Sequence, residues 1–173
     1  MSHYISMTDK LACTGNHPWH FNTTGADGRT VMCGDEPQSG ETLRKVALPW
    51  EPVKLPLFYK SEDGTVDRPA DAFAIVRDDG LGCLTKGRAV SESYTPFLNR
   101  RFVNVGDLLV ASGEAKWHTL GSLMGGRHVF GSLQAAGDVK VVGPSGIVDT
   151  LAPFLMLFSA HDGTHSLEAM FTT

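Results

Sequence analysis

The pattern of apolar and polar residues predicts a chain built mainly from strands. From residue 53 to residue 60 an apolar residue stands at every second position, with Lys54, Pro56, Phe58 and Lys60 between, which is the period of a strand with one strongly apolar face. Further short apolar runs, separated by turns rich in Gly and Asp, occupy residues 72–77, 81–85, 117–123, 128–134 and 139–142. The continuous apolar run at 152–160 is typical of a strand that is buried on both faces, so we expect Leu155, Leu157 and Phe158 in the core. Residues 166–172 are expected to pair back onto this strand.

Two segments have the period of a helix. In residues 39–48, Ser39 is a suitable N-cap and Pro49 stops the helix. In residues 99–112 the apolar side chains recur every three to four positions, and Gly113 is a suitable C′ residue. Gly106 weakens this second helix by about 1 kcal/mol relative to alanine. The pattern therefore predicts an α+β fold, a mostly antiparallel sheet with one main helix and one short helix.

The length of 173 residues fits one domain with a substantial core. Residues 1–38 have no sustained period, so we expect an irregular N-terminal arm followed by a single α+β domain over 39–173. The strand that ends the chain is expected to need a cover. A homo-oligomer would provide one, and so would the remainder of a longer protein.

Composition narrows the class of protein. The formal net charge of −4 gives no general attraction to nucleic acid or to an anionic membrane. No segment approaches the ~20 apolar residues of a membrane span. Three scattered cysteines do not make a disulfide framework, which favours reduced thiols and a cytoplasmic protein.

Several short motifs occur in a recognisable order along the chain. They are Pro18-Trp19-His20, Trp50-Glu51, Pro56-Leu57-Phe58, Tyr94-x-Pro96-x-x-Asn99, Gly121-Ser122-Leu123-x-Gly125-Gly126-Arg127, Pro153-Phe154-Leu155 and His161-Asp162-Gly163-Thr164. Together they resemble the N-terminal half of the phage/plasmid-like protein family, which is carried by phages, prophages and plasmids. Members of that family typically continue into a long helical half that is absent here. The resemblance implies a mobile genetic element and a bacterial cytoplasm, and it implies no reaction.

A local group of basic and aromatic residues points to nucleic acid despite the acidic total. Its members are Lys86, Arg88, Tyr94, Arg100, Arg101, Trp117 and Arg127. The cationic side chains would contact phosphates, while Tyr94 and Trp117 would stack on bases. We therefore expect a non-enzymatic protein that binds single-stranded nucleic acid, as an annealing accessory to recombination. The competing interpretation is a solvated surface with its aromatic residues packed inward.

Two other functions remain open. The first is a metal-dependent hydrolase, in which His20, His161, Asp162 and His165 would hold zinc or another divalent ion. The same His-Asp-Gly-Thr segment is also an ordinary hairpin turn. The second is an anti-defence protein that binds a host protein or a small signal molecule.

The glycine-rich segment before Arg127 also has two interpretations. It could form a tight turn or an anion site.

Overall fold

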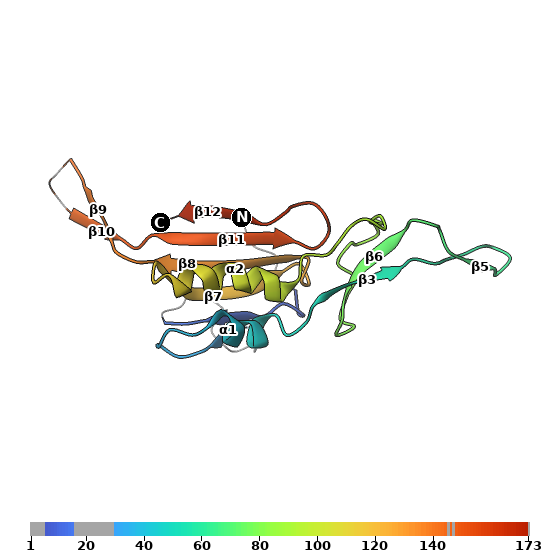
Figure 1. Ribbon diagram of the computed structural model, residues 1–173, viewed down its shortest axis with the longest axis horizontal. Coiled ribbons are helices and arrows are strands. Elements are labelled where there is room, and N and C mark those ends of the chain that lie inside the picture. The colour runs from blue at the N-terminus through green and yellow to red at the C-terminus, as the bar shows by residue number, and fades with distance from the viewer. Residues whose placement is uncertain (1–5, 16–29, 145, 147, 173) are drawn as a thin grey trace.

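The computed structural model describes residues 6–15, 30–144, 146 and 148–172. A six-stranded sheet lies at its centre, with strands in the order β12-β11-β8-β7-β1-β2 (Figure 1). The strands are β1 Leu11–Cys13, β2 Thr30–Met32, β7 Ala115–Leu123, β8 His128–Ala135, β11 Phe154–Ala160 and β12 Glu168–Thr172. All neighbouring pairs in this sheet are antiparallel except β1 and β2. The fold is α+β, as predicted.

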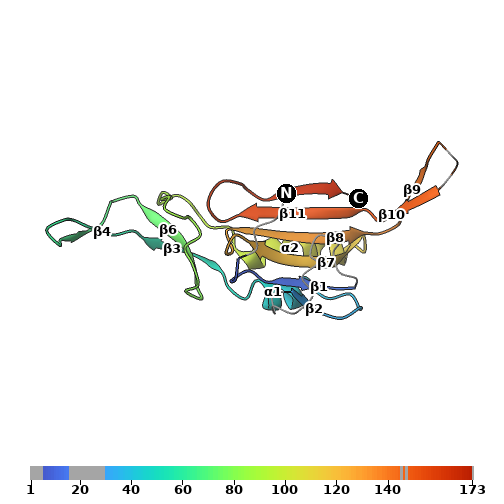
Figure 2. The same ribbon diagram turned by 180° about the vertical axis from the view of Figure 1, so that it is seen from behind.

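Both predicted helices are present, and both lie on one face of the sheet (Figures 1 and 2). Helix α1, Gly40–Ala47, begins after Ser39, whose hydroxyl accepts a hydrogen bond from the Thr42 amide at 3.2 Å. Helix α2, Asn99–Ala111, is followed by Gly113 with a φ of +78°. Helix α1 packs on β1 and β7, and α2 packs on β7 and β8. We call the opposite face of the sheet, which is nearer the viewer in Figure 2, the open face.

Glycines allow the helices to approach the sheet around one buried indole. Trp117 is 1% exposed, and its Nε1 donates to the Asp107 carboxylate at 2.7 Å. A Cβ on Gly106 would lie 2.2 Å from the indole, and one on Gly131 would lie 2.7 Å from it. Gly40 makes a similarly close approach at the start of α1. The helix-weakening glycine at position 106 is therefore required by packing between α2 and β7.

The structure corrects two expectations about the sheet. Residues 11–13 and 30–32 form strands of the sheet, so the prediction of an irregular arm is wrong for these residues. The sequence did not reveal these strands because three residues are too few to show a period. Strand β11 is not buried equally on both faces. Leu157 is 1% exposed beneath the helices, whereas Phe158 points to the open face and is only partly buried. Leu155 is also only partly buried.

Two-stranded ribbons project from opposite ends of the sheet (Figure 1). At one end β3, Pro52–Pro56, pairs with β6, Phe73–Arg77, and the short pair β4, Tyr59–Lys60, and β5, Val66–Asp67, extends it. At the other end β9, Val139–Val142, pairs with β10, Val148–Leu151. Both ribbons expose large apolar side chains. Within the described part of the chain, neither helix has the length and apolar character that crossing a membrane requires.

Candidate functional site

Several of the sequence motifs meet in a buried polar cluster at the start of α2. The Asn99 side-chain amide donates to the Trp50 carbonyl at 2.7 Å, and its oxygen lies 2.9 Å from Nε2 of His161. The Glu51 carboxylate accepts hydrogen bonds from the backbone amides of Asn99 and Arg100 at 2.7 and 3.1 Å. These bonds satisfy helix amides that have no partner within the helix. The cluster therefore ties β3, α2 and the end of β11 together.

His161 is held neutral inside this cluster. Its side chain is fully buried, its ring meets that of Trp50 edge-on with centroids 5.6 Å apart, and burial lowers its pKa to about 4. Because the Asn99 amide donates to a carbonyl, the Asn99 oxygen is free to accept, which assigns the proton of the neutral imidazole to Nε2. The other ring nitrogen, Nδ1, has no hydrogen-bond partner in the described residues. The ring is inaccessible to solvent, so the cluster has the character of a structural anchor.

The turn after β11 is held by ion pairing. The Asp162 carboxylate accepts from Nη2 of Arg127 at 2.7 Å and from both the amide and the hydroxyl of Thr164. Burial raises the pKa of this carboxyl, but the hydrogen bonds from Thr164 and Arg127 outweigh that effect, so its pKa lies below the ordinary value. Arg127 therefore pairs with a carboxylate of the chain itself, whereas the sequence analysis predicted that it contacts a phosphate.

The glycine segment before Arg127 forms the turn between β7 and β8. Met124, Gly125 and Gly126 all have positive φ, and the two glycine amides donate to the Asp9 carboxylate at 2.9 and 2.8 Å. A backbone anion site does exist here, but a carboxylate of the chain itself fills it. The turn interpretation is the one that the structure supports.

The predicted metal ligands have other partners. His161 is bonded to Asn99, Asp162 to Arg127, and the His165 ring lies 3.1 Å from the Glu168 carboxylate. His20 lies outside the described residues. Among residues 6–15, 30–144, 146 and 148–172, no three His, Cys, Asp or Glu side chains are placed to share a metal ion. The described residues thus do not form the predicted zinc site.

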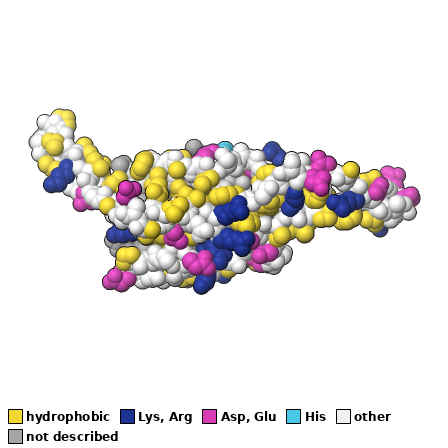
Figure 3. All heavy atoms as spheres, in the orientation of Figure 1, with side chains coloured by type: hydrophobic (Ala, Val, Ile, Leu, Met, Phe, Trp, Pro, Cys, Tyr) yellow, Lys and Arg dark blue, Asp and Glu magenta, His cyan; other side chains and the backbone are white. Residues whose placement is uncertain are grey.

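Of the seven predicted nucleic-acid residues, Arg127 is paired with Asp162, and the other six divide into three groups. Lys86, Arg88, Arg100 and Arg101 are exposed, and Lys and Arg side chains gather over the helix-covered side of the molecule (Figure 3). Tyr94 is partly buried beside Gly163. Trp117 is sealed beneath α2, so the expectation that its indole stacks on a base is wrong. The alternation of the strand places that side chain on the face that the helices cover.

A row of three side chains crosses the open face of the sheet. Lys116 of β7 is the register partner of Gln134 of β8, which is the register partner of Phe154 of β11. Register partners on neighbouring strands share a face, and strands lie about 4.8 Å apart, so the row spans about 10 Å. Lys116 is exposed, and the other two are partly exposed. The row therefore presents an ammonium group, an amide and an aromatic ring in line.

A β-bulge adds an imidazole to this row. The pairing of β7 with β8 shifts between Trp117 and Thr119, so His118 is an extra residue on β7. The His118 ring meets that of Phe154 edge-on at 5.2 Å, and its Nδ1 shares a hydrogen bond of 2.9 Å with the Thr119 hydroxyl. Bulges often redirect side chains at functional sites. This one places His118 beside Phe154.

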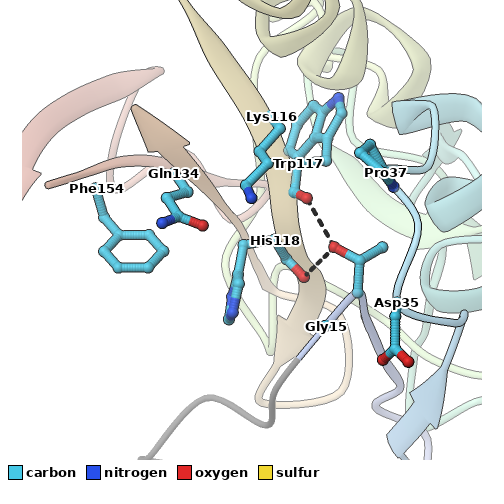
Figure 4. Close-up of a pocket in the computed structure, with 9 residues that line it drawn as sticks. Gly15, Asp35, Pro37, Lys116, Trp117, His118, Gln134 and Phe154 are labelled. Carbon is cyan, nitrogen blue, oxygen red and sulfur yellow. Dashed lines mark hydrogen bonds between the residues drawn. The ribbon is translucent and has the colours of Figure 1, made fainter. Parts of the chain in front are cut away.

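These residues line a pocket of about 410 Å³ (Figure 4). Lys116, His118, Gln134 and Phe154 form one side of it, and Asp35 and Pro37 lie across from them. Sequence reasoning missed this site, because a bulge and a register carry no motif. A local signal was His118, a polar residue within the predicted strand 117–123.

Part of the chain is similar to a known protein family. Residues 88–173 match a family described as a domain of unknown function (DUF932). The matched segment contains α2 and the strands β7 to β12, and so includes the whole open-face row. Of the His161 cluster it includes Asn99 and His161, but not Trp50 and Glu51. No curated protein and no solved structure matches the chain.

Proposed function

We propose that the protein binds single-stranded nucleic acid on the open face of its sheet, as an annealing accessory to recombination. One observation carries this proposal: aromatic rings lie at both ends of β11 on the open face. Phe154 lies against His118 at one end. At the other end Phe158 lies 5.2 Å from the ring of His128 and 6.0 Å from that of His165.

The spacing of these rings suits an unpaired strand. Phe154 and Phe158 are four residues apart on one strand, which separates them by about 13 Å. Sheets that bind single strands use such rings as platforms on which bases stack. Stacking of this kind requires exposed bases, so a duplex should bind less tightly. With a net charge of −4, phosphate attraction can only be local, and Lys116 is the exposed cation in the row.

Fluorescence anisotropy with a labelled oligonucleotide tests the proposal. Single-stranded DNA should bind more tightly than the matching duplex, and the affinity should fall as salt is raised. Failure of the single strand to bind at low salt would overturn the proposed function. The variant Arg100→Ala/Arg101→Ala compares the two sides of the sheet. This variant should bind DNA like the wild type if the DNA lies on the open face. Loss of binding would instead indicate that the DNA contacts the basic side chains of α2.

The mobile-element setting is part of the proposal and is supported by the motifs that resemble the phage/plasmid-like family. In that setting the protein would work in a bacterial cytoplasm. A survey of gene neighbourhoods tests this directly. Genes for this chain should lie beside phage, plasmid or recombination genes, and a consistent position among housekeeping genes would contradict the setting.

A second candidate, an anti-defence protein that binds a host protein, is favoured by the ribbon of β3 and β6. Val53 and Leu55 are 38% and 48% exposed on that ribbon, and Leu81 beyond it is 59% exposed. Exposed apolar patches of this kind mark interaction surfaces. Affinity capture from host lysate with wild-type protein and with Leu55→Ser tests this function. A partner that both proteins retain equally would exclude this ribbon as the interface. Light scattering on the same samples would show whether the chain forms the expected homo-oligomer.

A further inference from the structure

We infer that the pocket beside Phe154 holds one unpaired nucleotide of the bound strand, with its base against the Phe154 ring and its phosphate at Lys116. This inference rests on the proposed function and names the part of the open face that recognises the ligand. The pocket volume of about 410 Å³ is within the range of small-ligand sites and large enough for a nucleotide.

The register supplies the three contacts that a nucleotide needs. An aromatic ring stacks on the base, a side-chain amide offers both a donor and an acceptor to the base edge, and an ammonium group pairs with phosphate. Phe154, Gln134 and Lys116 provide these groups in that order on three adjacent strands. The span of about 10 Å between the outer two strands matches a nucleotide that lies across the strands.

The bulge gives the ring of Phe154 a defined position. His118 meets it edge-on and is itself bonded to Thr119, so the two rings form a fixed corner of the pocket. A rigid platform loses less conformational freedom on binding than a mobile side chain does. The extra residue in β7 therefore helps to shape the part of the pocket that contacts the base.

Charge orients the nucleotide within the pocket. Asp35 lies across from the Phe154 side and is exposed, while Lys116 projects into the pocket from β7 (Figure 4). A carboxylate repels phosphate and accepts hydrogen bonds from base amino groups or a ribose hydroxyl. The phosphate is therefore directed to Lys116, and the sugar or the base edge is directed toward Asp35.

The test uses single-stranded DNA that contains one 2-aminopurine, whose fluorescence is quenched when it stacks. Binding to the wild type should quench the fluorescence, and Phe154→Trp should keep the effect because it keeps an aromatic face. Phe154→Leu retains apolar volume but not stacking, so affinity should fall about tenfold and quenching should be lost. Lys116→Ala should weaken binding and should lower the salt slope by about 0.7, the value for one phosphate contact on a single strand.

Two matched controls lie away from the pocket. Phe171→Leu removes a ring that is 78% exposed on the other face of the sheet, and Lys140→Ala removes an exposed lysine of the β9–β10 ribbon. Both should bind like the wild type. If the oligonucleotide binds but the pocket variants match these controls, the nucleotide pocket is overturned while the proposed function stands. If neither the oligonucleotide nor adenosine monophosphate binds, both are overturned.

Discussion

The two faces of the central sheet use the same strands for different purposes. On the helix-covered face, Trp117 and Leu157 are 1% exposed, and the polar groups Asn99 and His161 are bonded to each other. On the open face, Phe154 is partly exposed, and its neighbours across the strands are an amide and a lysine. Adjacent residues of one strand thus belong either to the core or to a candidate binding surface. Substitutions one residue apart therefore test the packing of the core and the proposed recognition separately.

The largest expected effect is on the covered face. Trp117→Ala should lower the free energy of unfolding by about 3–5 kcal/mol, because it leaves a cavity among residues that approach the indole closely. The Asp107 carboxylate would also lose the donor at 2.7 Å. Denaturant unfolding measures the change. A loss below about 1 kcal/mol would mean that α2 does not pack on β7 as described.

The buried neutral histidine predicts that the stability of the protein depends on pH. Burial lowers the pKa of His161 to about 4, whereas its ordinary value is 6.5. Between these values the unfolded chain gains a proton that the folded chain excludes, so stability falls as the pH drops from about 6.5 to 4. The full loss is about 3 kcal/mol at 1.36 kcal/mol per pKa unit. Unfolding of wild type and of His161→Gln at several pH values measures it. An identical slope for the two proteins would contradict the assignment.

Neighbouring residues on β11 sharpen the comparison of the two faces. Leu157→Ala should destabilise by about 2–4 kcal/mol because its side chain is fully packed. Phe158→Ala, despite the larger side chain, should cost only about 1–2 kcal/mol because the ring is partly exposed already. Denaturation midpoints of the two variants give the comparison. The reverse order would mean that the open face carries the main core.

The smallest expected effect on stability belongs to the open-face row. Gln134→Ala should change the free energy of unfolding by no more than about 0.5 kcal/mol, as is usual for a surface position without a structural bond. Thermal unfolding of the variant beside wild type measures it. A loss above about 1.5 kcal/mol would make Gln134 a structural residue and would remove the row from the binding surface.

The sequence predicted local structure well where local chemistry sets it. The Ser39 cap, Pro49 and the apolar period fixed α1, and the same kind of pattern fixed α2 up to Gly113. The glycine turn between β7 and β8 was also predicted, because positive φ favours glycine strongly. Strand β1 was missed, since three residues are too few to show a period.

The candidate site shows the limit of local reasoning. The basic residues Arg100 and Arg101 were predicted to contact nucleic acid because they are charged and adjacent in sequence. Lys116, Gln134 and Phe154 are up to 38 residues apart and become one row only through the register of three strands. No short motif encodes a register. The role of Trp117 was misassigned for the same reason, since which face of the sheet the helices cover is a long-range property.

By itself, the sequence determined the α+β class, both helices and the main turns, because capping, periodicity and positive φ depend on residues close together in the chain. Only the tertiary structure decided which side of each strand is covered, where the bulge places His118 and which distant side chains share a pocket. The physical reason is that strand pairing and helix docking are settled by packing over the whole core. A single residue's shift in register would exchange the two faces, yet it would leave the local sequence pattern unchanged.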